Sequence, residues 1–221
     1  MRLNQYLLLM ITMLLPLTAN AAVPTSDGWD NGDLSGWRRN TAWTNVSVVN
    51  SGGNVDGYLL SVSDPGGNPS RTIGALSEED RYTGDFQTPN IKNAAVDLNL
   101  LNGSVQHVYL RFRYHDDTYN GWFYEITGTL NTNEWSHFSV TFDPSWTDSE
   151  AVAAGWAKES NTPTFSETMQ DVYTTEIRVL SSAEDINDTR IGIDNFRIGL
   201  TEAVPLFDHW SKTLLILILG A

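Results

Sequence analysis

The sequence predicts a single all-β domain, an antiparallel β-sandwich of the jelly-roll type. Apolar and polar residues alternate in short runs through the middle of the chain, so each run has one face for a core and one for solvent. Segments rich in glycine, proline, asparagine and aspartate separate these runs at residues 51–54, 64–69 and 116–121. Short alternating strands with such turns between them are typical of a sandwich or jelly roll.

The alternating runs place the predicted strands along the chain. They lie at residues 58–63, 96–100, 108–114, 121–127, 138–142, 177–179 and 191–198. The runs at 108–114 and 121–127 flank a polar loop and predict a β-hairpin. The best helix candidate covers residues 149–158, with Asp148 or Ser149 as its N-cap.

The side chains of the predicted hairpin divide between two faces. Trp122 and Tyr124 share one face of the second strand, with Glu125 on the other. Arg111 and Arg113 occupy the polar face of the first strand, where an ion pair with Glu125 would contribute about 0.2 to 1 kcal/mol. The arginines therefore fit a solvated strand face, and contact with the hydroxyls of a sugar, or with an acidic sugar, is the alternative.

The last predicted strand is interrupted. It reads I-G-I-D-N-F-R-I, and Asp194 and Asn195 break its alternation. A β-bulge at this pair would let the isoleucines before it and Phe196 after it face the same core.

The chain is acidic and has no cysteine. Lys and Arg total 13 against 27 Asp and Glu, a formal net charge of −14. Phosphate binding draws on clustered cations, so the composition argues against a nucleic-acid partner, while acidity fits solubility outside the cell. Stability without disulfides must come from a packed core or a bound ion. One domain of about 200 residues is long enough to bury roughly 70% of its unfolded surface.

Residues 1–21 have the order of a secretory signal peptide. Arg2 precedes an apolar run, and the segment ends in Ala19-Asn20-Ala21, which predicts cleavage after Ala21 and a mature domain over 22–200. An uncleaved membrane anchor is the alternative, although Pro16 interrupts the short apolar run.

From Trp29 to Gly199 the chain resembles the jelly-roll modules related to the laminin B (type IV) domain and to galactose-binding-like carbohydrate modules. The resemblance is carried by D-G-W-D-N-G-D-L-S-G-W at 27–37, W-S-H-F-S-V-T-F at 135–142 and the I-D-N-F ending. It implies a sandwich whose first and last strands lie side by side, with Trp37 and Trp135 mainly buried.

The resemblance also implies a structural calcium ion where those two strands meet. By matching position, Asp194 would join Asp30 and Asp33 there. Ca²⁺ takes about six to eight hard oxygen ligands, which carboxylates and backbone carbonyls supply. The bulge and the ion are compatible explanations of the interrupted strand.

Eight tryptophans offer candidate sugar-stacking surfaces. Trp122 and Trp146 lie in or near predicted loops and are the aromatic ligand-binding candidates, together with Arg111 and Arg113. Core packing is the alternative for each tryptophan. The sequence contains no H-E-x-x-H, G-x-S-x-G or phosphate-binding motif, and its paired carboxylates are chain neighbours with no indication of a cleft between them, so an enzyme is not expected.

The C-terminal segment 201–221 resembles the IPTL-CTERM sorting tail, which is related to the PEP-CTERM class. The residues that fit the motif are Val204, Pro205, Leu206, Asp208 and Trp210. The resemblance implies export in a Gram-negative bacterium and recognition by an exosortase-type enzyme. The final apolar run of eight residues is shorter than the roughly 20 that a helical span needs, so the tail is expected to be incomplete or degenerate. A last strand or docking segment is the alternative.

These observations predict an exported, non-enzymatic module at the cell surface or envelope that binds carbohydrate or matrix polymer. The tail, if complete, would reach the membrane. The alternatives are a structural or adhesive surface protein without a small ligand and, less favoured, a divergent enzyme acting on polysaccharide.

Overall fold

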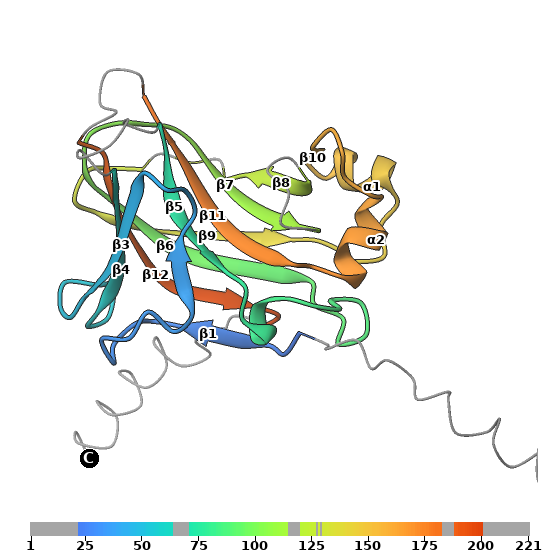
Figure 1. The fold of residues 1–221 in the computed structure, drawn as a ribbon, viewed down its shortest axis with the longest axis horizontal. Coiled ribbons are helices and arrows are strands. Elements are labelled where there is room, and N and C mark those ends of the chain that lie inside the picture. Colours follow the sequence, from blue (N-terminus) through green and yellow to red (C-terminus); the bar gives the residue numbers. More distant parts are fainter. Residues whose placement is uncertain are drawn as a thin grey trace, which may run out of the picture.

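The structure is a computed structural model that describes residues 22–63, 71–114, 120–126, 128, 130–182 and 188–200. Two antiparallel six-stranded sheets pack face to face, which confirms the predicted all-β sandwich (Figure 1). The predicted signal peptide at 1–21 and the tail at 201–221 lie outside the described residues.

The first sheet has the strand order β3-β4-β12-β6-β9, and β1 also pairs with β12. Its strands are β1 (Thr25–Asp27), β3 (Thr44–Val49), β4 (Tyr58–Ser63), β6 (Asn93–Asn102), β9 (Trp135–Thr141) and β12 (Arg190–Ile198). The expected pairing of the first and last strands is therefore confirmed, with Asp27 opposite Phe196.

The second sheet has the strand order β10-β8-β7-β11-β5-β2. Its strands are β2 (Trp37–Arg39), β5 (Thr72–Ser77), β7 (Val105–Arg113), β8 (Gly121–Glu125), β10 (Trp156–Lys158) and β11 (Thr174–Ser181). The predicted hairpin is present as β7 and β8.

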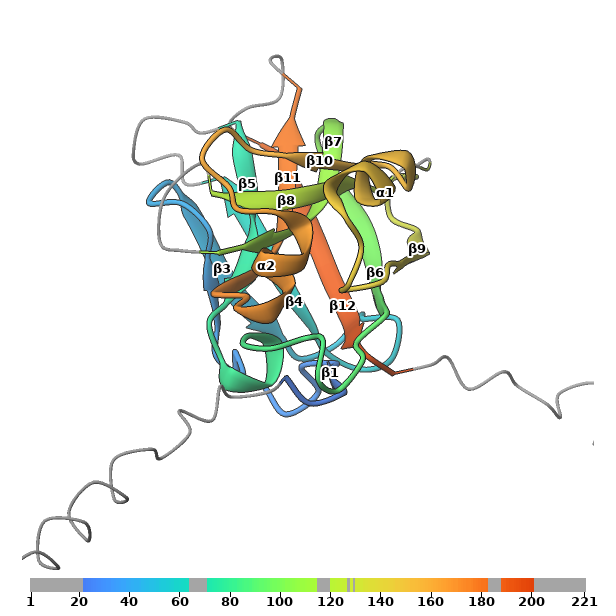
Figure 2. The ribbon, with the colours of Figure 1, turned by 90° about the vertical axis from the view of Figure 1, so that its right-hand side faces the viewer.

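Short helices lie at one end of the sandwich, beside β8 and β10 (Figure 2). They are α1 (Asp148–Ala153) and α2 (Phe165–Gln170), and a 3-10 turn covers Asp80–Tyr82. The helix predicted over 149–158 starts from the N-cap Thr147 and stops early, because Gly155 takes a φ of 97° and the chain then enters β10. Within the described ranges, no helix is both long and apolar enough to cross a membrane.

The core between the sheets is rich in aromatic rings. Trp37, Trp122, Trp156, Phe112 and Phe196 are almost fully buried. Trp37 meets Phe196 edge to face at 4.9 Å between ring centroids, and Phe112 stacks on Trp156 at 5.5 Å. Their burial supplies the stability that the cysteine-free chain cannot obtain from disulfides.

The interruption in β12 is a β-bulge, as one of the two explanations predicted. The register between β12 and β6 shifts between Asp194 and Arg197, and Asn195 adopts a left-handed φ of 48°. The isoleucines before the bulge and Phe196 after it are all fully buried. One extra residue therefore keeps both halves of the strand facing the core.

The bulge also marks a change of neighbour along β12. Arg190 to Ile193 pair with β4, whereas Phe196 to Ile198 pair with β1. In the gap between β4 and β1, Asp194 Oδ2 accepts a hydrogen bond from the Asn54 backbone N–H at 2.7 Å. The buried carboxylate thus satisfies a donor that has no strand partner at this point.

We predict that the left-handed geometry at residue 195 makes Asn195→Val less stable than Asn195→Gly by about 1 to 2 kcal/mol. Both substitutions remove the hydrogen bond that Asn195 Nδ2 donates to Asp97, so their difference isolates the backbone cost. Urea unfolding of the two variants measures it. Equal stabilities would show that the bulge does not constrain this residue.

Candidate functional site

The outer face of the second sheet carries an unusual set of charged and aromatic side chains. Along β7, Val108, Leu110 and Phe112 face the core, so the intervening Tyr109, Arg111 and Arg113 lie on the outer face. Neighbouring β11 sets Glu176 opposite Arg111 and Arg178 opposite Tyr109. Two strands therefore supply adjacent rows of outward side chains.

A first hollow of about 180 Å³ lies on this face. Its lining consists of Tyr109, Arg111, Phe123, Glu159, Arg178 and Leu180. Tyr109 and Phe123 come from adjacent strands, and their rings meet edge to face with centroids 5.2 Å apart. Burial raises the pKa of Tyr109, which further favours the protonated hydroxyl.

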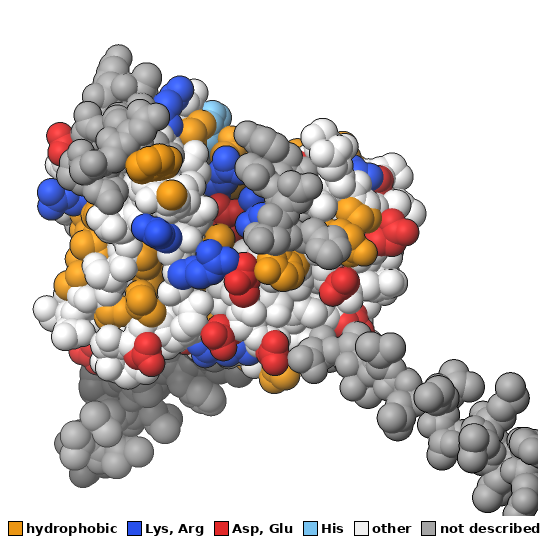
Figure 3. Space-filling model, in the orientation of Figure 1, with side chains coloured by type: hydrophobic (Ala, Val, Ile, Leu, Met, Phe, Trp, Pro, Cys, Tyr) orange, Lys and Arg blue, Asp and Glu red, His pale blue; other side chains and the backbone are white. Residues whose placement is uncertain are grey.

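A second hollow of about 260 Å³ shares Arg111 and Arg178 with the first. Its other charged and polar lining residues are Arg38, Asn40, Thr41, Thr72, Arg113 and Glu176. We call the two hollows together the sheet-face groove. Lys and Arg side chains gather on this side of the molecule over β5, β11 and β7, with acidic side chains among them (Figure 3).

Arg111 is held at the centre of the groove between two carboxylates. Its Nη1 donates to Glu176 Oε2 at 2.8 Å and its Nη2 to Glu159 Oε2 at 2.5 Å. Burial opposes its charge, but Glu176 and Glu159 outweigh burial and raise the pKa of the guanidinium above its ordinary value. Arg111 thus remains charged while only 3% exposed.

The expectation of an ion pair between these arginines and Glu125 is wrong. The register of β7 and β8 sets Arg111 opposite Phe123 and Tyr109 opposite Glu125. Glu125 instead pairs with His107, with 2.6 Å between His107 Nδ1 and Glu125 Oε1. Sequence spacing gave the faces of the hairpin but not this register, which tertiary pairing sets.

Trp122 is a poor ligand-binding candidate, contrary to the sequence prediction. It lies in the predicted strand, as the second residue of β8, but its side chain faces inward. It is fully buried, its ring meets Phe165 at 5.2 Å, and its Nε1 donates to Pro163 O at 3.3 Å. Trp122 is therefore a core residue, and the outward aromatic of β8 is Phe123, which the alternation could have indicated.

Trp146 lies away from the sheet-face groove, on the other sheet's side. It is half-buried and lines a hollow of about 600 Å³ together with Lys92, Asn93, Ser139 and Thr141. Its ring packs against Phe165 at 6.1 Å. Contact of Trp146 with a ligand stays a prediction, separate from that of the arginines.

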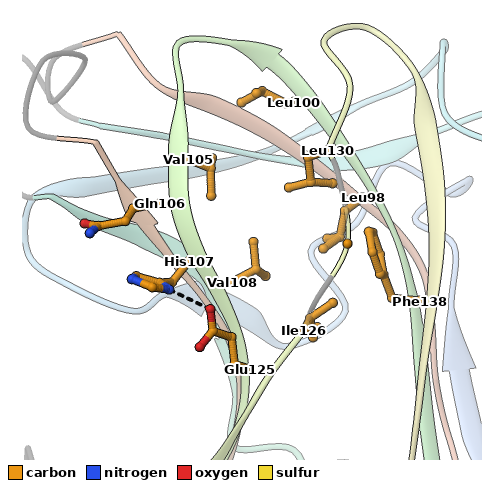
Figure 4. A pocket seen from close by; sticks show the side chains of 11 residues that line it. Leu98, Leu100, Val105, Gln106, His107, Val108, Glu125, Ile126, Leu130 and Phe138 are labelled. Carbon is orange, nitrogen blue, oxygen red and sulfur yellow. Dashed lines mark hydrogen bonds and ion pairs between the residues drawn. The ribbon is translucent and has the colours of Figure 1, made fainter.

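A further cavity of about 390 Å³ lies between the sheets. Aliphatic side chains from Leu98, Leu100, Val105 and Leu130 line it, with the pair of His107 and Glu125 at its edge (Figure 4). Gln106, His107 and Glu125 add polar groups to this lining, so the cavity could also receive a polar ligand. The sheet-face groove is the stronger candidate because it sets aromatic rings beside fixed charged groups.

The bulge in β12 forms a second polar cluster, on the outer side of the first sheet. Asp97 Oδ2 accepts hydrogen bonds from Asn54 Nδ2 at 2.7 Å and from Asn195 Nδ2 at 2.8 Å, and Asp97 Oδ1 lies 2.5 Å from His137 Nδ1. Burial raises the pKa of neighbouring Asp194 to about 6. This carboxylate is thus costly to keep charged without further compensation.

Two of the three predicted metal-binding aspartates converge near this cluster. A Cβ on Gly28 would lie 3.4 Å from Asp30 Oδ2, 3.6 Å from Asn195 Oδ1 and 3.8 Å from Asp194 Oδ1. Asp33 is exposed, and its carboxylate accepts a hydrogen bond from Ser35 N within its own turn. Within the described ranges, no group of three or more His, Cys, Asp or Glu side chains is arranged to hold a metal.

Solved structures with the same fold include carbohydrate-binding modules. The CBM22-2 xylan-binding domain of Paenibacillus barcinonensis Xyn10C aligns with 80% of this chain and 99% of its own, at 14% identity and a TM-score of 0.51. This chain shares the jelly-roll fold of that module. At such low identity the likeness establishes the fold alone.

Two larger proteins contain the same fold as one part. The CBM22-1–GH10 modules of Clostridium thermocellum xylanase 10B, complexed with xylohexaose, match 81% of this chain and 29% of their own, at 14% identity and a TM-score of 0.51. An exo-β-agarase matches 78% of this chain and 25% of its own, at 13% identity and a TM-score of 0.51. No protein-family model and no curated protein sequence matches the chain.

We predict that Arg111→Met destabilises the domain by about 3 to 5 kcal/mol, because it leaves two buried carboxylates without their cation. Arg38→Met is the matched control: Arg38 pairs with Glu78 at the exposed rim of the groove, and its loss should cost less than about 1 kcal/mol. Urea unfolding measures both. Similar costs for the two variants would contradict the central role of the buried pair.

Proposed function

We propose that the sheet-face groove binds carbohydrate. The observation that carries this proposal is the half-buried pair of Tyr109 and Phe123 beside the charged side chains of Arg111 and Glu159. Aromatic rings offer flat faces to a sugar ring, and fixed guanidinium and carboxylate groups offer hydrogen-bond partners to its hydroxyls. The xylan-binding domain of the same fold supports this choice of ligand class.

The groove is built on strands, which suits recognition with little entropy loss. Tyr109 and Arg111 belong to β7 and Arg178 to β11, near the middle of the second sheet. The two ion pairs of Arg111 hold neighbouring side chains in place before a ligand arrives. Less ordering is then required on binding, which favours affinity.

We predict that the full chain is retarded in native gels that contain its polysaccharide, and that Tyr109→Ala lowers its affinity roughly tenfold, the loss of one stacking contact. Trp43→Ala is the matched control, because Trp43 is 43% exposed but lies outside the groove lining. The test panel includes xylan, agarose and an acidic polysaccharide.

Three results, from native gels, cell association and a reducing-end assay, separate the alternatives. Migration that no polysaccharide changes, with the protein still attached to cells, would contradict carbohydrate binding and favour a structural or adhesive role. Release of new reducing ends from a bound polymer would favour an enzyme. An equal loss of affinity in Trp43→Ala would place the binding surface elsewhere.

The proposal places the groove outside the cytoplasm. Its support is the signal-peptide order of residues 1–21 and the sorting-tail resemblance at Val204, Pro205, Leu206, Asp208 and Trp210. An exosortase-type enzyme would process this tail, leaving the module at the envelope or releasing it. Extracellular polymer is then the ligand within reach.

A structural calcium ion forms a second part of the proposal. The oxygens of Asp30, Asp194 and Asn195 that converge beside Gly28 are hard donors of the kind that Ca²⁺ prefers. An ion there would compensate the buried charge of Asp194 and tie the N-terminal segment to β12. Asp33, which lies in its own turn, is left out of this site.

We predict that calcium at about 100 times its Kd stabilises the chain by about 2.7 kcal/mol, a rise in Tm of roughly 5 to 10 °C over protein in chelator. The rise should be smaller at pH 5 than at pH 7.5, because burial raises the pKa of Asp194 to about 6 and protons then compete for its carboxylate. Differential scanning calorimetry measures both effects.

Asp30→Asn should abolish most of this calcium response, whereas the matched variant Asp33→Asn should keep it. A wild-type Tm that calcium leaves unchanged at pH 7.5 would remove the ion from the proposal.

A further inference from the structure

The charge of the sheet-face groove is opposite to that of the protein. The chain carries a formal net charge of −14, with 13 Lys and Arg in all. Four of these cations line the groove, against two glutamates, Glu159 and Glu176. A cationic hollow on a strongly acidic protein concentrates anions at that one place.

Two of the four arginines in the groove already form ion pairs within the protein. Arg111 is buried between the two glutamates, and Arg38 pairs with Glu78 at the rim. Arg178 differs from both. Its half-buried guanidinium makes no hydrogen bond or ion pair with any residue that the structure describes. Its five N–H donors are available to a ligand.

The surroundings of Arg178 leave room for a ligand beside it. Arg178 lines both hollows, and its strand neighbours are Tyr109 on β7 and Gly74 on β5. Gly74 presents no side chain, and the amide of Asn40 lies over it, where Asn40 Nδ2 donates to Ile73 O and to Glu176 Oε1. Tyr109 and Phe123 form the aromatic end of the same groove. A cation without a counter-charge therefore stands next to a ring surface.

We propose that the groove is specific for an anionic polysaccharide, whose carboxylate or sulfate group binds Arg178 while its sugar ring rests on Tyr109. This inference rests on the proposed carbohydrate binding and names its ligand class. A planar guanidinium matches such oxyanions through paired, charge-assisted hydrogen bonds. The hydroxyls of a neutral sugar can also accept from Arg178, but their hydrogen bonds are weaker than those of an oxyanion.

The test compares each polymer with an uncharged version of itself. Isothermal titration calorimetry of the full chain uses polygalacturonate against its methyl ester for carboxylate, and dextran sulfate against dextran for sulfate. We expect at least one charged polymer to bind roughly tenfold more tightly than its uncharged partner. Binding should weaken as salt is raised.

Variants at Arg178 assign the effect to this residue. Arg178→Gln should lower affinity for the charged polymer roughly tenfold and remove most of the preference over its uncharged partner, while Arg178→Lys should retain part of the preference. Arg190→Gln is the matched control, since Arg190 is an exposed arginine on β12 in the other sheet. Its binding should equal that of the wild type, as should the Tm of every variant.

The possible failures are distinct. Equal binding of charged and uncharged polymers, or a preference that Arg178→Gln does not change, would overturn this inference and leave carbohydrate binding intact. Binding to no polymer in either this or the broader panel would overturn the proposed function itself. If Arg178→Gln and Arg190→Gln lowered affinity for the charged polymer equally, overall charge and not Arg178 would explain the preference, and this inference would be overturned.

Discussion

The bulge at Asp194 and Asn195 is the constraint on which the first sheet depends. β12 lies inside that sheet and has β4 beside its first half and β1 beside its second. Without an extra residue at the junction, the side chains after it would change faces and Phe196 would leave the core. The polar pair occupies the one place where the strand must lose alternation, and its carboxylate satisfies the backbone of the loop that covers the gap.

In the second sheet, the alternation of inward and outward residues forms the candidate binding site. Inward residues such as Phe112 and Ile177 complete the aromatic core, which frees the outward residues of β7 and β11 to form the sheet-face groove. Arg111 is buried there with two carboxylates, an arrangement that adds little net stability but fixes its neighbours. Because the ion pairs of Arg111 fix these neighbours, Arg178 and Tyr109 can contact the same ligand from fixed positions.

Several residues show where sequence reasoning succeeded and where it failed. The outward position of Arg111 and Arg113 followed from the period of two, and the bulge followed from two polar residues among isoleucines. Trp122 was chosen as a ligand candidate because it lies near the polar loop, although the strand predicted over 121–127 contains it and β8 begins at Gly121. The alternation that buries Trp122 also exposes Phe123, so that error was avoidable. The partners of Arg111 were not predictable, because Glu159 and Glu176 are 48 and 65 residues away.

The sequence by itself determined the all-β class, the hairpin, the bulge and which residues of β7 face outward, because these follow from local alternation and turn chemistry. Only the tertiary structure decided strand order, the register that sets Arg111 opposite Phe123, and the meeting of Asp30 with Asp194 beside Gly28. The physical reason is that the first set of features depends on residues close in the sequence and the second on residues far apart. Side-chain direction repeats every two residues along a strand, whereas pairing between distant strands depends on how two whole sheets bury their apolar faces.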